Sequence, residues 1–135
     1  MIAKATSLVN KKERLIMKYL CIVHFEGSIF ETMSEEDKRT LDRDSLAYDQ
    51  GLIAKGKMIH AEALQSPDSA ALVRVRNGAM SMTDGPYSEA KEQMGGFILI
   101  EARDMNEAVS IAAGIPLAKR GTIEVRPIYQ IPDPE

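Results

Sequence analysis

The 135-residue sequence contains no tryptophan and a single cysteine, Cys21. One cysteine cannot form a disulfide bond within the chain, and its rarity suits a reducing compartment, so we expect a cytoplasmic protein. No run approaches the roughly 20 apolar residues of a membrane-spanning helix, so no membrane partner is expected. Long basic runs are also absent and the net charge is −3, which argues against a nucleic-acid binder held by phosphate contacts.

The sequence does contain enough apolar material for one folded core, because 44% of its residues are hydrophobic. This length and composition predict a single domain. Residues 1–16 differ: they are polar and lack the long apolar run of a secretory signal. Lys12-Glu13 can be encoded by a ribosome-binding sequence shortly before Met17, so we hypothesise that Met17 is the natural start; the alternative is a genuine extension. We therefore expect an N-terminal extension 1–16, a domain 17–130 and a loose tail 131–135.

Local patterns predict the strands and helices. Ser34 before three acidic residues is an N-cap signal, and Gly56 fits the C′ position of the same helix. Asn77-Gly78 between two alternating runs is the strongest short hairpin signal, since both turn residues need positive φ. Asp104 and Glu107 form a variant of the capping box. The predicted strands are Lys18–Phe25, Met58–Leu64, Leu72–Arg76, Ala79–Thr83, Gly95–Ala102 and Thr122–Ile128, and the predicted helices are Glu35–Lys55 and one from Asp104 to about Gly114.

The predicted order is β-α-β-β-β-β-α-β, an α+β fold. Without the inserted hairpin, this order is the split βαβ pattern of a ferredoxin-like fold. Such a sheet covers one face with two helices, and the chain offers no further element for its other face. A second copy of the chain is the simplest cover, so we predict a homodimer.

The most informative segment is Thr83–Phe97, TDGPYSEAKEQMGGF, which is too long for a tight turn. Asp84-Gly85-Pro86 is a turn unit, in which the Asp side chain can cap backbone amides and Pro restricts the backbone. The polar stretch that follows, with Glu89, Lys91 and Glu92, suits a short helical turn. Gly95-Gly96 would let the backbone pass close to another chain or a ligand.

The stretch DGPYSEAKEQMGGF resembles the signature of the DGPF proteins of the YCII-related family, with Tyr87 where Phe is usual. The resemblance extends from Met17 to Ile128 and includes the MKY opening, the RVRNG hairpin and the closing G-x-I-E-V-R-P. It implies a bacterial protein with ferredoxin-like protomers that form a dimeric α+β barrel. It also implies association with sigma factors, to which many such proteins are fused or adjacent.

Enzyme-like members of the broader superfamily carry a His–Asp pair, with the His on the first helix. The first helix of this chain has no histidine, and the matching stretch reads Asp44-Ser45-Leu46-Ala47. The Asp-Pro of those relatives corresponds to Ile115-Pro116. That pair is therefore not carried over, and any activity must come from other residues.

Asp84 is the leading candidate for a site residue. Its carboxylate could act as a general base or bind a polar ligand group; the structural alternative is a turn cap, and both roles could coexist. Neighbouring candidates for ligand contact are Gly85, Pro86, Tyr87, Glu89 and Glu92. Alternation places His60 and Glu62 on one face of a strand, where they could form an acid–base pair or a structural hydrogen bond.

The sequence gives weaker support for a functional role of the other polar and reactive residues. His24 ends a strand with Glu26 on the same face, where solvated polar residues are common. No ligand spacing supports a metal site, and Cys21 lies in an apolar strand that favours inert burial. No phosphate-binding glycine motif, serine elbow or cysteine-pair zinc motif occurs, so no cofactor is expected.

Two hypotheses of different classes remain open. The first is a small-molecule binding protein or cofactor-independent enzyme, with a pocket beside the DGPY loop and near Asp84, Glu92 and His60. The second is a non-catalytic regulatory module that works beside a sigma factor.

Overall fold

The computed structural model of the protein describes residues 16–134. The predicted extension 1–16 therefore lies outside the described residues except for Ile16. Residues 128–134 have no regular secondary structure.

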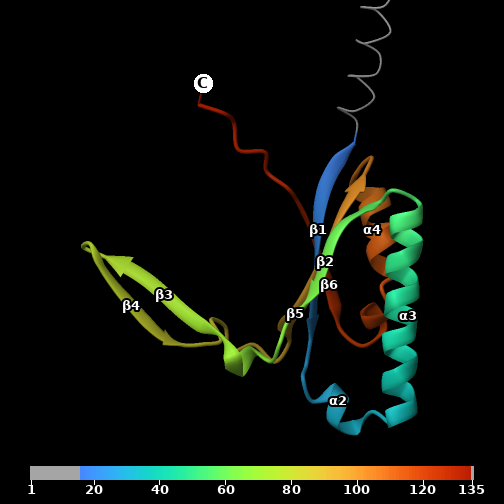
Figure 1. Ribbon diagram of the computed structural model, residues 1–135, viewed down its shortest axis with the longest axis horizontal. Coiled ribbons are helices and arrows are strands. Elements are labelled where there is room, and N and C mark those ends of the chain that lie inside the picture. Colours follow the sequence, from blue (N-terminus) through green and yellow to red (C-terminus); the bar gives the residue numbers. More distant parts are fainter. Residues whose placement is uncertain (1–15, 135) are drawn as a thin grey trace, which may run out of the picture.

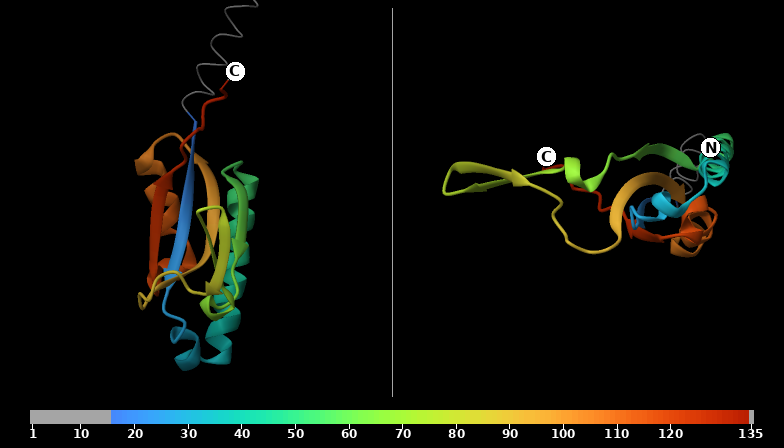
Figure 2. Two further views of the ribbon diagram at one scale, coloured as in Figure 1. Left: turned by 90° about the vertical axis from the view of Figure 1, so that its left-hand side faces the viewer. Right: turned by 90° about the horizontal axis from the view of Figure 1, so that it is seen from below.

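The main sheet has four antiparallel strands in the order β2-β5-β1-β6. They are β1 (Met17–Phe25), β2 (Met58–Ala63), β5 (Gln93–Ala102) and β6 (Thr122–Pro127). Helices α3 (Glu35–Ala54) and α4 (Met105–Ala113) cover one face of this sheet (Figures 1 and 2). The predicted α+β class is confirmed, and the six predicted strands and two predicted long helices are present with their ends shifted by a few residues at most. Three short helical segments were not predicted: α2 (Ile29–Thr32), η1 (Pro67–Ser69) and η2 (Pro116–Lys119).

The core lies between the sheet and the two helices. Alternate residues of β1 and β5 supply its centre, and Cys21 and Ile100 are fully buried. Small residues of α4 let that helix approach the sheet closely, since Ala108 and Ala112 are buried. The buried members are Tyr19, Cys21, Val23, Leu52, Ile98, Ile100, Ala102, Ala108, Ala112 and Ile115.

The opposite face of the sheet, called here the open face, has no helix on it (Figure 2). The residues that alternate with the core positions of β1 and β5 lie on this face. They include Leu20, Ile22, Phe97 and Leu99, which form an apolar centre, and polar residues of the edge strands β2 and β6 flank them. The main sheet thus has one face covered by helices and one partly apolar open face.

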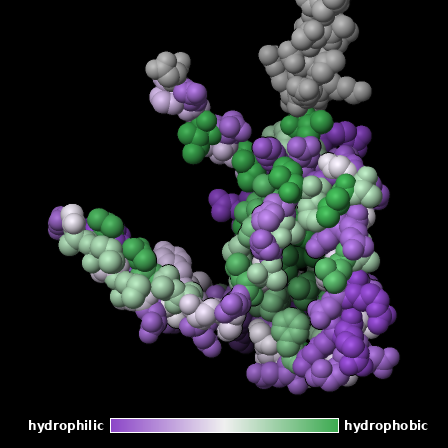
Figure 3. Space-filling model, in the orientation of Figure 1, coloured by the Kyte–Doolittle hydropathy of each residue, from purple (hydrophilic) through white to green (hydrophobic). Residues whose placement is uncertain are grey.

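Strands β3 (Ala71–Arg76) and β4 (Ala79–Asp84) form a separate two-stranded sheet, called here the arm. Asn77 and Gly78 adopt φ values of 51° and 77°, which confirms the predicted hairpin turn. The arm projects from the body on the side of the open face (Figures 1 and 2). Its surface is largely apolar in the view of Figure 3.

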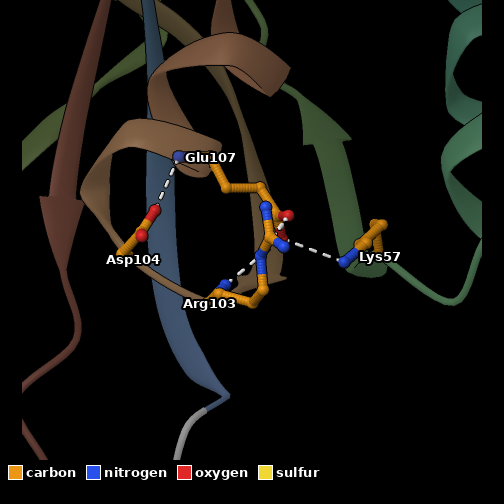
Figure 4. A network of polar contacts seen from close by, with 4 residues as sticks. All are labelled: Lys57, Arg103, Asp104 and Glu107. Carbon is orange, nitrogen blue, oxygen red and sulfur yellow. Dashed lines mark hydrogen bonds and ion pairs between the residues drawn. The ribbon is translucent and has the colours of Figure 1, made fainter.

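The helix caps follow the sequence signals in part. Ser34 Oγ accepts a hydrogen bond from Asp37 N, and Gly56 has a φ of 70° beyond the end of α3. Asp104 Oδ1 accepts from Glu107 N at 2.9 Å, as predicted. The Glu107 carboxylate does not complete the capping box with Asp104, however, because it binds Arg103 and Lys57 instead (Figure 4).

Candidate functional site

The loop 85–92 connects the arm to β5 and contains no helical turn, so that prediction was wrong. The side chain of Gln93 explains the difference. Its Nε2 donates to the carbonyl oxygens of Ser88 and Ala90 at 2.7 and 2.6 Å. These carbonyls are satisfied by a side chain, so the loop needs no helical hydrogen bonds. Gly85 N donates to Ala70 O at 2.8 Å, which closes the base of the arm.

A pocket of about 590 Å³, called here the loop pocket, lies between this loop and the segment that enters β3. Pro86, Tyr87 and Glu92, all predicted ligand residues, line it. Its other polar lining residues are His24, Gln65, Ser66, Ser69, Ser88 and Gln93, and its apolar ones are Leu64, Pro67, Ala70, Leu72, Ala90 and Met94. An apolar wall with a few hydrogen-bonding groups is typical of small-molecule sites.

His24 is held at this pocket by a carboxylate. Its Nε2 lies 2.9 Å from Glu124 Oε1, and both side chains are partly exposed. The partner of His24 is thus on β6, 100 residues away in the sequence. Next to this pair, Thr122 Oγ1 donates to Glu92 Oε1 at 2.8 Å. Because His24 and Thr122 are paired across β1 and β6, Glu92 is anchored beside His24.

Five predicted site residues do not line the loop pocket, and three of them lie in or next to the loop. Asp84 is the last residue of β4 and is exposed. Its side chain forms no hydrogen bond or ion pair with any residue between 16 and 134, so the cap is not formed there. Gly85 contributes its backbone to the base of the arm, and Glu89 is exposed in the loop.

His60 and Glu62 lie on the edge strand β2, away from the loop pocket lining. His60 Nε2 is 3.0 Å from Glu62 Oε2, and 59% of each side chain is exposed. The His60 ring lies 6.1 Å from the Phe97 ring on the open face. The structure therefore brings His60 and Glu62 together as the alternation predicted, but it does not join them to Asp84 or Glu92.

The glycine pair after the loop makes close contacts within this chain. A Cβ atom at Gly95 would overlap the Phe25 ring, and one at Gly96 would lie 2.8 Å from the Glu62 carbonyl oxygen. The backbone of β5 thus passes close to β1 and β2 where it leaves the loop pocket.

Comparison with known proteins assigns most of this chain to a protein family. The model of the YCII-related domain matches residues 17–132. The chain belongs to the YCII-related domain family. An uncharacterised protein of Rhizobium meliloti (strain 1021) is 31% identical over 114 residues, which cover 83% of this chain and 92% of that protein.

A second cavity of this YCII-related domain, about 640 Å³, lies between α3 and the sheet. Asp42, Ser45 and Asp49 line it from one side of α3, and aromatic walls come from Phe25 and Phe30. Burial raises the pKa of the Asp49 carboxyl above its ordinary value. The sequence signal for this cavity was the spacing of three and four residues between these polar groups, which places them on one helix face.

Between residues 16 and 134, no group of three or more His, Cys, Asp or Glu side chains could hold a metal ion. No helix in that range is long and apolar enough to cross a membrane.

Burial raises the pKa of the Cys21 thiol to about 11, so this cysteine is no nucleophile at neutral pH.

Proposed function

We propose that this protein binds a small polar molecule in the loop pocket and that His24 is the residue that accepts a proton or hydrogen bond from it. The observation that carries the proposal is the His24–Glu124 pair at the wall of the pocket. The pocket adds apolar surface for the body of a ligand and hydroxyl and amide groups for its polar atoms.

The chemistry of the pair supports a role as base. A carboxylate that accepts a hydrogen bond from Nε2 places the proton of a neutral imidazole on that nitrogen and leaves Nδ1 as the acceptor. A carboxylate in this position also stabilises the imidazolium that forms when His takes up a proton. Proton transfer of this kind needs no cofactor, so the same pocket suits a binding protein or a cofactor-independent enzyme.

Ligand-observed NMR with small carboxylic acids, amino acids and hydroxy compounds tests the proposal. We expect at least one compound to bind, and His24→Gln to weaken its affinity by about 10-fold or more through loss of the basic imidazole nitrogen. His60→Gln is the matched control, because His60 also pairs with a glutamate but does not line the loop pocket. Equal weakening by both substitutions, or no binding to the wild-type protein, would contradict the proposal.

We also propose that the protomer is ferredoxin-like with an inserted hairpin and that two copies join their open faces into a dimeric α+β barrel. The strand order and the two helices on one face support the protomer assignment. Leu20, Phe97 and Leu99, which are partly exposed, supply an apolar centre that a second sheet would bury.

Sedimentation velocity tests the dimer. Leu99→Glu would place a charge at the centre of the proposed interface, so we expect the variant to sediment as a folded monomer. Ile53→Glu is the control, because Ile53 is exposed on α3, on the helix-covered side. A wild-type protein that is monomeric at micromolar concentration would refute the assembly.

A further inference from the structure

The arm presents an apolar surface that no described residue covers. Val73 pairs with Met82 and Val75 pairs with Met80, so the four side chains lie on one face. Each of them is between 60% and 68% exposed. The strands of the arm hydrogen-bond only to each other within residues 16–134. Because a two-stranded hairpin alone is marginally stable in water, this face needs a partner surface.

The two faces of the arm differ in character. The face opposite the apolar one carries Arg74, Arg76, Ser81 and Thr83, together with Leu72, which lines the loop pocket. Alternation of this kind is typical of a ribbon with one buried and one solvated face. The pattern therefore indicates that the valine and methionine face of the arm packs against another surface, while the opposite face stays in contact with solvent.

The position of the arm favours a second copy of this chain as that surface. The arm leaves the body on the same side as the open face (Figures 1 and 2). The C-terminal tail also extends on that side, with Tyr129 and Ile131 more than three-quarters exposed. A partner seated on the open face would thus lie within reach of the arm, and in a two-fold dimer each copy would meet the other's arm.

We propose that in the homodimer the apolar face of each arm packs against the other copy. The proposal rests on the dimer inferred above and adds a second contact to it. Ala70, Leu72 and Pro86, at and next to the base of the arm, line the loop pocket. Docking of the arm on the partner thereby holds one wall of the loop pocket in place.

Photo-crosslinking with isotope labelling tests the contact directly. Met80→p-benzoylphenylalanine places the probe on the apolar face, and Ser81→p-benzoylphenylalanine, one residue along, places it on the opposite face. Mixed unlabelled and ¹⁵N-labelled chains distinguish crosslinks between copies from those within one copy. We expect position 80 to give crosslinks between copies in several-fold higher yield than position 81. Equal yields, or crosslinks from position 80 only within one chain, would overturn the proposal.

Sedimentation equilibrium separates this proposal from the dimer itself. Val75→Asp with Met80→Asp should weaken dimerisation by about 100-fold or more through lost apolar burial. Ser81→Asp with Thr83→Asp, on the other face, should leave it within a few-fold of wild type. A wild-type dimer that the first pair leaves unchanged would refute the arm contact and leave the dimer standing. A monomeric wild-type protein would refute both.

Discussion

His24 Nε2 lies 2.9 Å from Glu124 Oε1, although 100 positions separate the two residues in the sequence. Strands β1 and β6 are neighbours in the sheet, and they bring the pair to the wall of the loop pocket. The sequence had favoured the other histidine, His60, which instead pairs with Glu62 on an edge strand.

Glu124→Gln should separate function from stability. The pair is partly exposed, so its loss should change the free energy of unfolding by less than about 1 kcal/mol. The amide replaces the carboxylate that accepts from His24 Nε2, so any pocket ligand that needs the imidazole held in this tautomer should bind more weakly. Urea denaturation and ligand titration of the same sample check this, and a large loss of stability with unchanged affinity would contradict it.

Asp84→Ala should leave the fold intact. The side chain is exposed and has no partner among residues 16–134, so the free energy of unfolding should change by at most about 0.5 kcal/mol. Thermal unfolding measures this. With the fold unchanged, any loss of ligand affinity would assign Asp84 a binding role, whereas a strongly destabilised variant would restore the turn-cap interpretation.

Glu107→Gln should reduce stability more at neutral pH than in acid. The hydrogen bond from Lys57, followed by that from the Arg103 backbone and the charges of both residues, lowers the pKa of Glu107. A lowered pKa in the folded state stabilises the protein above the ordinary value of about 4.5, and this contribution disappears as pH falls through the folded pKa. Denaturation should show a larger difference from wild type at pH 7 than at pH 3, whereas Glu89→Gln, in the exposed loop, should show none at either pH.

Asp49→Asn should increase the stability of the folded protein at neutral pH, the opposite of the effect expected for Glu107→Gln. Burial raises the pKa of Asp49, so its ionisation disfavours the folded state once the pH exceeds the ordinary aspartate value. The variant should therefore be more stable than wild type at pH 7 and equal to it at pH 3. Calorimetry at both pH values checks this, and a variant that is less stable at pH 7 would indicate an unrecognised partner of the carboxylate.

Cys21 should be unreactive in the folded protein. With a pKa of about 11 against the ordinary 9.0, its thiolate fraction near pH 8 is about 100-fold lower than in the unfolded chain. Its reaction with Ellman's reagent should be slower than in denaturant by at least that factor, because burial also blocks access. Rapid native labelling would show that β1 opens readily.

Several features of the fold could be predicted because they depend on nearby residues. The Asn77-Gly78 turn, the Ser34 and Asp104 caps and the end of α3 at Gly56 each need only a few neighbours in sequence. The alternation that pairs His60 with Glu62 is equally local. The short helix α2 was missed because its place depends on the packing of Phe30 edge-on against Phe25, with ring centroids 5.2 Å apart.

The α+β class, the element order and the segment Thr83–Phe97 could be recognised from the sequence, because hydrophobic periodicity, turn residues and motifs depend on neighbouring positions. Which polar groups meet depends on the three-dimensional fold. The register of β1 against β6 joins His24 to Glu124, and Gln93 folds the loop that lines the pocket. Partners across a sheet depend on strand pairing between residues far apart in the sequence, whereas caps, turns and alternation depend on adjacent residues.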